Sequence, residues 1–191
     1  MSRGDVPKQH HDEGKGERMK SRIRVLYPGL SLLLMLLLVM VGCNHGGKGN
    51  VNREAPGFTL KDLEGRHVSL HEFGGKIVLL DFWATWCPPC RRSIPELISL
   101  QDRYEDQGLV VIGISLDDPA KASDRFLQSF KEQNRMNYPV LRGGQRVVQD
   151  YFGDEQLGIP TMFVINRDGE IVDRHVGFVP GALEKAIREI L

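Results

Sequence analysis

Cys87 and Cys90 are the side chains of this sequence best suited to do chemistry, and they lie in the decapeptide DFWATWCPPC of residues 81–90. Two cysteines separated by two residues can be half of a metal site, a structural disulfide or a redox pair. A disulfide between positions so close in sequence closes a very small loop and adds little stability. Reversible exchange between dithiol and disulfide is therefore the use that this spacing favours.

A structural zinc site is the first alternative, and it needs four ligands. Residues 55–191 contain only the two cysteines of the pair. The histidines of this part fall in predicted strands or loops without a paired ligand motif: His67, His71 and His175. Zinc is thus the weaker interpretation. We predict no metal ligands and no cofactor other than a redox-active disulfide between Cys87 and Cys90.

The pair lies where a buried strand is predicted to turn into a helix. KIVLLDF, residues 76–82, is a short continuous apolar run, which is typical of a strand buried on both faces. A helix is expected from about Pro88 to Tyr104. Pro88 and Pro89 suit its first turn, because no amide hydrogen bond is lost there.

Cys87 is predicted to lie at about the N-cap of that helix. The unpaired amides and the helix dipole favour negative charge there, which lowers the pKa of a thiol from about 8.5 towards about 3.5–7.5. Cys90 lies one turn further in and is shielded. One thiol is therefore expected to attack and the other to complete the exchange.

The remaining patterns alternate between strands and helices. LVVIGIS, residues 109–115, is a second buried strand, and strand, helix and strand in this order indicate a parallel right-handed unit. The other expected elements are a hairpin over about 58–70, a helix over 119–136, a short strand in 137–141, a helix from 145, a hairpin of 161–166 with 170–176, and an amphipathic helix after Pro180. The predicted fold class is an α/β sandwich with a mixed sheet and helices on both faces.

The N-terminal part carries the features of an export signal. Residues 26–41 form an almost unbroken apolar run without charge, after the basic flank of Lys20, Arg22 and Arg24. We assign residues 19–42 to a signal peptide and expect residues 1–18 to be a disordered leader or a misassigned start. A single uncleaved membrane span is the alternative.

Val41, Gly42 and Cys43 resemble the bacterial lipoprotein box, which implies lipidation of Cys43. Residues 43–54 are rich in Gly and Asn and are predicted to be a tether. Residues 55–191 then form one domain. The chain has 25 basic and 25 acidic side chains, so nothing favours a nucleic-acid partner.

The cysteine decapeptide, the segment Gly158-Ile159-Pro160-Thr161, and the final hairpin and helix resemble the thioredoxin superfamily. The hairpin in front, the secretion signal, and the extra helix and strand between about 119 and 141 are similar to its membrane-tethered TlpA/ResA branch. The resemblance covers about residues 55–191. It implies a thioredoxin-like three-layer sandwich with an N-terminal hairpin and a central helix–strand insert.

The resemblance also implies roles for single residues. Cys87 matches the attacking thiol and Cys90 the resolving thiol. Pro160 matches a cis-proline that turns the backbone of Ile159 towards a substrate strand; a trans proline at the entry of a strand is the alternative. Trp86 matches the tryptophan of the substrate face, to which we also assign Pro88 and Pro89, although Trp86 is equally suited to simple packing.

Asp81 ends the predicted buried strand, where a carboxylate without a partner is costly and its pKa rises. Thioredoxins carry an acid at the matching position, which implies proton transfer to the resolving thiol. The TlpA/ResA branch often has Asn instead. A half-exposed acid without a role is the alternative.

The resemblance implies a thiol-disulfide oxidoreductase that is anchored by lipid to a membrane and faces the periplasm. It would act on protein disulfides as a reductant fed by a membrane electron donor, with apocytochrome c thiols as one target. Two alternatives differ in class. A peroxiredoxin-like peroxidase shares the hairpin APGFTLKDLEGR but requires a Thr where Ala84 stands, and a binding lipoprotein would have no activity.

Overall fold

A mixed sheet of six strands forms the centre of the computed structural model, which describes residues 53–191. The strand order is β1-β8-β7-β4-β5-β6, and β2 pairs with β3 in a separate hairpin. The strands are β1 (Arg53–Glu54), β2 (Thr59–Lys61), β3 (His67–Ser69), β4 (Ile77–Trp83), β5 (Leu109–Ser115), β6 (Val140–Arg142), β7 (Thr161–Ile165) and β8 (Glu170–Val176). The helices are α2 (Pro88–Tyr104), α3 (Asp124–Gln133), α4 (Gln145–Phe152) and α5 (Ala182–Arg188), with short 3-10 helices η1 (Leu70–Phe73) and η2 (Glu105–Gln107).

The two central strands have the parallel pairing that the sequence predicts. β4 pairs with β5 in parallel along its whole length, and β7 flanks β4 on the other side in the antiparallel sense. Every residue of β4 is buried, because helices cover both faces of the sheet. The predicted bounds of α2, Pro88 to Tyr104, are confirmed.

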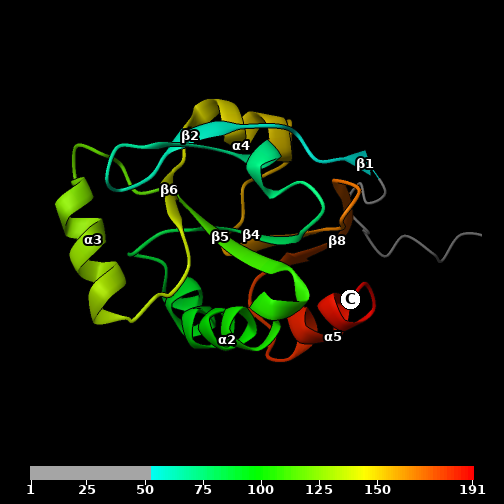
Figure 1. Cartoon of the computed structure of the whole chain (residues 1–191). Coiled ribbons are helices and arrows are strands. Elements are labelled where there is room, and N and C mark those ends of the chain that lie inside the picture. The colour runs from blue at the N-terminus through cyan, green and yellow to red at the C-terminus, as the bar shows by residue number, and fades with distance from the viewer. Residues whose placement is uncertain (1–52) are drawn as a thin grey trace, which may run out of the picture. The chain divides into compact units, whose positions relative to one another are not determined.

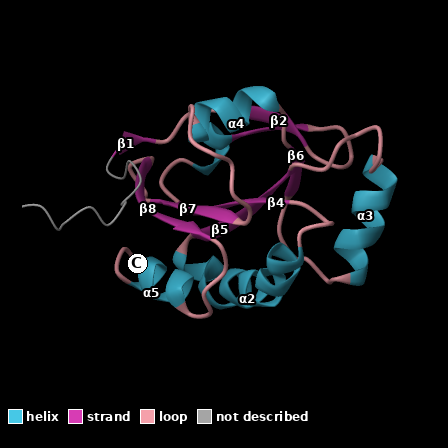
Figure 2. Cartoon of the chain, turned by 180° about the vertical axis from the view of Figure 1, so that it is seen from behind, coloured by secondary structure: helices cyan, strands magenta, loops and turns pink. Residues whose placement is uncertain are grey.

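Two hydrophobic cores lie on opposite faces of the sheet. Leu79 and Trp83 of β4 belong to the core under α2 and α5, whereas Leu80 and Phe82 belong to the core under α4 and the hairpin. Successive strand residues point to opposite faces, so β4 supplies both cores in turn. Figures 1 and 2 show α2 and α5 on one side of the sheet and α4 with β2 on the other. The predicted three-layer sandwich is confirmed.

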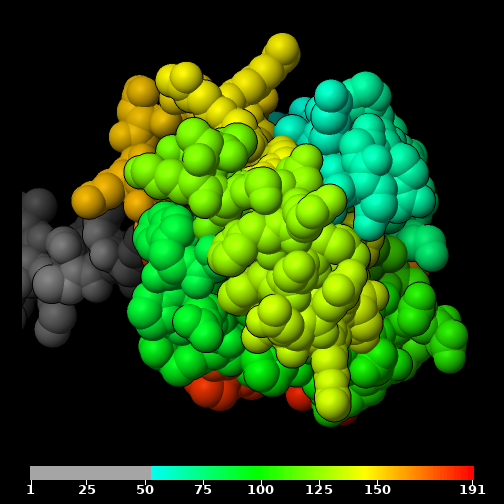
Figure 3. Space-filling view, turned by 90° about the vertical axis from the view of Figure 1, so that its left-hand side faces the viewer, coloured from blue at the N-terminus to red at the C-terminus, as the bar shows by residue number. Residues whose placement is uncertain are grey.

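The insert consists of α3 and the edge strand β6, and Figure 3 shows its residues beside those of the hairpin. α3 begins at Asp124, five residues later than the predicted start at Pro119, because the hydroxyl of Ser123 caps it by accepting from the Phe126 amide at 3.3 Å. The amphipathic helix predicted after Pro180 is α5, which ends at Arg188, so Leu191 lies beyond it.

Strand β1 was not expected. Arg53 and Glu54, which the sequence assigns to the tether, pair with Ile171 and Glu170 at the edge of the sheet. Pairing of this kind depends on an edge that other parts of the chain create, so local composition does not signal it. The predicted leader of residues 1–18, the signal peptide of 19–42 and the lipidation candidate Cys43 lie outside the described residues. Within residues 53–191, no helix is long and apolar enough to cross a membrane.

Candidate active site

Cys87 and Cys90 form a disulfide at the start of α2, with their sulfur atoms 2.06 Å apart. Cys87 is the N-cap, as predicted, and its sulfur accepts a hydrogen bond of 3.3 Å from the Cys90 amide. Both side chains are buried, Cys87 with 3% and Cys90 with 0% of its surface exposed. An amide and a helix N-terminus directed at the Cys87 sulfur stabilise a thiolate when the disulfide is reduced.

The loop before β7 faces this disulfide. The Ile159–Pro160 peptide bond is cis, as predicted, which excludes the trans alternative. The carbonyl oxygen of Ile159 lies 3.6 Å from the Cys87 sulfur. The loop is held by a hydrogen bond of 2.6 Å from the Thr161 hydroxyl to the Gly158 carbonyl. The backbone of Ile159 is thus fixed next to the sulfur that the sequence assigns to attack.

Trp86 projects from the turn before the disulfide and leaves 66% of its surface exposed, so simple packing does not explain it. Pro88 is also exposed and Pro89 is half-buried. Val176 extends this apolar surface, since it is 62% exposed and its Cγ1 lies 3.2 Å from the Cβ position of Gly158. Exposed apolar side chains therefore lie beside the buried disulfide, and a second protein can cover them.

Asp81 is almost completely buried, with 1% of its surface exposed, so the alternative of a half-exposed acid is wrong. Within residues 53–191, no group hydrogen bonds to its Oδ1. Burial raises the pKa of Asp81 to about 8. Strand alternation places Asp81 on the same face of β4 as Leu79 and Trp83, which pack with Cys90 in one core.

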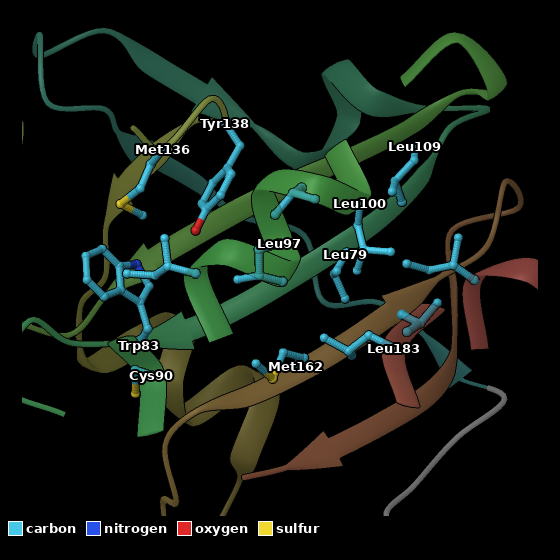
Figure 4. Close-up of a cluster of buried hydrophobic side chains, with 14 of the residues drawn as sticks. Leu79, Trp83, Cys90, Leu97, Leu100, Leu109, Met136, Tyr138, Met162 and Leu183 are labelled. Atoms are coloured by element: carbon cyan, nitrogen blue, oxygen red, sulfur yellow. The ribbon is translucent and has the colours of Figure 1, made fainter. Parts of the chain in front are cut away.

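Two further polar atoms are buried in this core: Trp83 Nε1 and Tyr138 Oη. Among the described residues, neither has a hydrogen-bond partner. Gly113, the neighbour of Asp81 on β5, lies beneath both rings: a Cβ there would be 2.9 Å from Trp83 Nε1 and 3.4 Å from Tyr138 Cε2. Figure 4 shows the Tyr138 hydroxyl turned into the core on the side of Trp83. Burial, and secondly the charge of Asp81, raise the pKa of Tyr138 well above its usual value.

Sequence reasoning missed a second buried carboxylate near the disulfide. Asp117, just after β5, accepts hydrogen bonds from the amide and the hydroxyl of Thr85, two residues before Cys87. The only sequence signal for Asp117 is its position just after the second buried strand. The carboxyl ends of the parallel strands β4 and β5 meet at the same edge of the sheet, so a residue just after β5 lies near the turn that follows β4. Ser93, in α2, is also buried, and its hydroxyl donates to the Cys90 carbonyl at 2.8 Å.

The histidines considered for zinc lie apart on different elements: His67 on β3, His71 on η1 and His175 on β8. Among the residues that the structure describes, no group of three or more His, Cys, Asp or Glu side chains is placed to hold a metal ion. The chemistry that the described site offers is that of its two sulfur atoms and the carboxyl of Asp81.

Comparison with known proteins gives the site a context. Residues 51–174 match the model of the AhpC/TSA family. The chain is 35% identical over 138 residues to the thiol-disulfide oxidoreductase ResA of Halalkalibacterium halodurans, which covers 72% of this chain and 73% of that protein. It is 36% identical over 151 residues to the thioredoxin-like protein YneN of Bacillus subtilis, covering 79% and 82%.

A solved structure is similar throughout the described domain. A crystal structure from Chlorobium tepidum, assigned as a thiol:disulfide interchange protein DsbE, has a TM-score of 0.65 and 33% sequence identity. The match covers 74% of this chain and 97% of that one. The similarity in sequence and the similarity in fold thus point to proteins whose names describe the same thiol chemistry.

Proposed function

The chain belongs to the AhpC/TSA family and is a thiol-disulfide oxidoreductase of the ResA/DsbE type, and on this premise we propose that it reduces disulfides of proteins outside the cytoplasm. The observation that carries the proposal is the position of Cys87 at the N-cap of α2, with the Cys90 amide 3.3 Å from its sulfur. This arrangement favours the thiolate, which is the attacking species in disulfide exchange.

The proposed reaction has two exchanges. The Cys87 thiolate attacks one sulfur of the target disulfide, a Cys87–target disulfide forms, and the other target sulfur leaves as a thiolate that takes up a proton. The Cys90 thiolate then attacks the Cys87 sulfur, closes the bridge between Cys87 and Cys90, and releases the second target thiolate. Two electrons pass from this protein to the target, and another dithiol must reduce the bridge before the next cycle.

Asp81 is the proposed acceptor of the proton that the Cys90 thiol loses before the second exchange. Both side chains belong to the core between β4 and α2, and that core is closed to solvent. Because burial raises the pKa of Asp81 to about 8, both forms of its carboxyl are present near neutral pH: the ionised form accepts the Cys90 proton, and the protonated form releases it again. The proposed contact with the target is formed by the exposed Trp86 and Pro88 and the partly exposed Pro89 and Ile159, with the buried Pro160 holding the backbone of Ile159 in place.

Reduction of insulin by dithiothreitol tests the activity. The Cys43→Ser variant is compared with the Cys43→Ser/Cys87→Ser double variant, so that Cys43 contributes to neither rate, and the unsubstituted chain is the matched control. We expect the Cys87→Ser variant to fall to the uncatalysed rate. Equal rates in the presence and absence of Cys87 would contradict the proposal. Hydrogen peroxide consumption that depends on Cys87 would instead support the peroxidase alternative.

The location and the partners complete the proposal. Export by residues 19–42 and lipidation at Cys43 would hold the domain at a membrane, facing the periplasm, with a membrane protein as the electron donor. Apocytochrome c thiols are the proposed target class, since reduced thiols are required there. Incorporation of labelled palmitate into the chain, and its loss in Cys43→Ala, tests the anchor.

A further inference from the structure

The carboxylate of Asp117 has no place in the exchange steps above, although it is buried with 4% of its surface exposed. Its Oδ1 accepts the Thr85 hydroxyl at 2.7 Å, and its Oδ2 accepts the Thr85 amide at 3.0 Å. The Ser115 hydroxyl donates to Oδ2 at 2.9 Å. A buried carboxylate is tolerated only with such donors, so the geometry of this group is closely determined.

The turn between β4 and the disulfide has few other fixed points. The Cys87 amide donates to the Ala84 carbonyl at 3.2 Å, which closes the turn. Within residues 53–191, Asp117 is the only residue whose side chain hydrogen bonds to residues 84–86. Trp86, in the middle of the turn, is 66% exposed and so cannot hold the turn by packing. Ala84 is buried in the core, and Thr85 is the residue of this turn that is held by side-chain hydrogen bonds.

Asp117 is itself held from the insert. Its amide donates to the Ser115 hydroxyl at 3.2 Å, and its carbonyl accepts from Arg142 of β6 at 3.4 Å. Arg142 also pairs with Asp124 at 2.6 Å, and its side chain is only 13% exposed. A continuous set of polar contacts thus runs from the insert through Asp117 to the residue that precedes Trp86.

We propose that Asp117 is a positioning residue for thiol-disulfide exchange with protein targets. By holding Thr85 it fixes the turn before Cys87, and through this turn it sets the direction of Trp86 towards a protein that carries the target disulfide. The inference rests on the proposed function, because it concerns how that site meets its target. Misplacement of reacting groups by about 1 Å can cost about a hundredfold in rate, so such an anchor has measurable consequences.

The test separates positioning from mere stability by using two substrates. Insulin needs the surface around Trp86, whereas hydroxyethyl disulfide is small and needs only the Cys87 sulfur. The variants are Asp117→Asn and Thr85→Val, with Thr85→Ser as the conservative rescue, all in the full chain with Cys43→Ser. Asp62→Asn is the matched control, because it removes another buried, hydrogen-bonded carboxylate without touching Asp117 or residues 84–86.

We expect Thr85→Val and Asp117→Asn to lower kcat/KM for insulin by about tenfold while changing the rate with hydroxyethyl disulfide by less than about twofold. Thr85→Ser and Asp62→Asn should stay within about twofold of the wild type for both substrates. If both rates fall in parallel, or if only the unfolding midpoint in urea moves, Asp117 is structural and the inference is overturned. A wild type that fails to reduce insulin would overturn the proposed function instead.

Discussion

Replacing Asp81 by asparagine is expected to remove a large pH dependence of stability. Burial raises the pKa of Asp81 from 3.8 to about 8 in the folded protein. Between these two values the folded state holds a proton that the unfolded chain has released, so the free energy of unfolding falls as pH rises. A difference of about 4 pKa units at about 1.4 kcal/mol per unit corresponds to about 6 kcal/mol across the whole range. This stability is fully present below pH 3.8 and is lost by about pH 8.

Urea unfolding of the oxidised protein between pH 5 and pH 9 measures the effect. The quantity that matters is the difference in free energy of unfolding between the wild type and Asp81→Asn, because other titrating groups cancel in it. Relative to the variant, the wild type should lose about 1.4 kcal/mol for each pH unit up to about pH 8 and then level off. Asparagine cannot ionise, so the variant should be the more stable protein at pH 9.

Asp62→Asn is the matched control. Asp62 is also buried, but hydrogen bonds from Arg66 and from the Glu64 amide, together with the charge of Arg66, outweigh burial and hold the pKa of Asp62 below its usual value. The stability that ionised Asp62 contributes is present above its unfolded pKa and is lost in acid. The free energy of unfolding of Asp62→Asn should therefore change with pH in parallel with that of the wild type from pH 5 to pH 9. A pH-independent difference between the wild type and Asp81→Asn would refute the reasoning, since it would mean that the folded core accepts the ionised carboxyl.

Three further predictions concern the same core and the sulfur pair. Gly113→Ala should lower the free energy of unfolding by about 1–3 kcal/mol, measured in urea, because its Cβ would lie 2.9 Å from Trp83 Nε1; an unchanged midpoint would mean that the indole moves freely. Tyr138→Phe should change that free energy by less than about 1 kcal/mol, since the hydroxyl has no hydrogen-bond partner among the described residues, and a loss above about 2 kcal/mol would reveal one. Cys90→Ser should hold targets as mixed disulfides on Cys87, seen on non-reducing gels; capture no greater than in a Cys87→Ser/Cys90→Ser double variant would count against the exchange mechanism.

The sequence by itself determined the elements around the disulfide. The unbroken apolar run of β4, the prolines at the start of α2 and the position of Cys87 as N-cap are properties of neighbouring residues, and all three were predicted correctly. Local signals are sufficient there because burial on both faces, capping and fixed proline geometry act within one turn or one strand. Before α3, the local pattern placed the start of the helix at Pro119, whereas the cap formed by Ser123 sets it at Asp124.

Only the tertiary structure decided how the polar groups around the disulfide are partnered. Asp117 holds Thr85 across 32 positions of the chain, whereas Asp81, in the interior of the same sheet, has an oxygen without a partner in the described domain. The sequence places Asp81 within a buried strand and Asp117 just after one, but it does not show which donors reach either carboxylate. Their difference arises from the register of β4 and β5, which places Gly113 beside Asp81 and the end of β5 beside the turn before Cys87. Register depends on all the contacts of the sheet at once, so it is set by the folded chain as a whole.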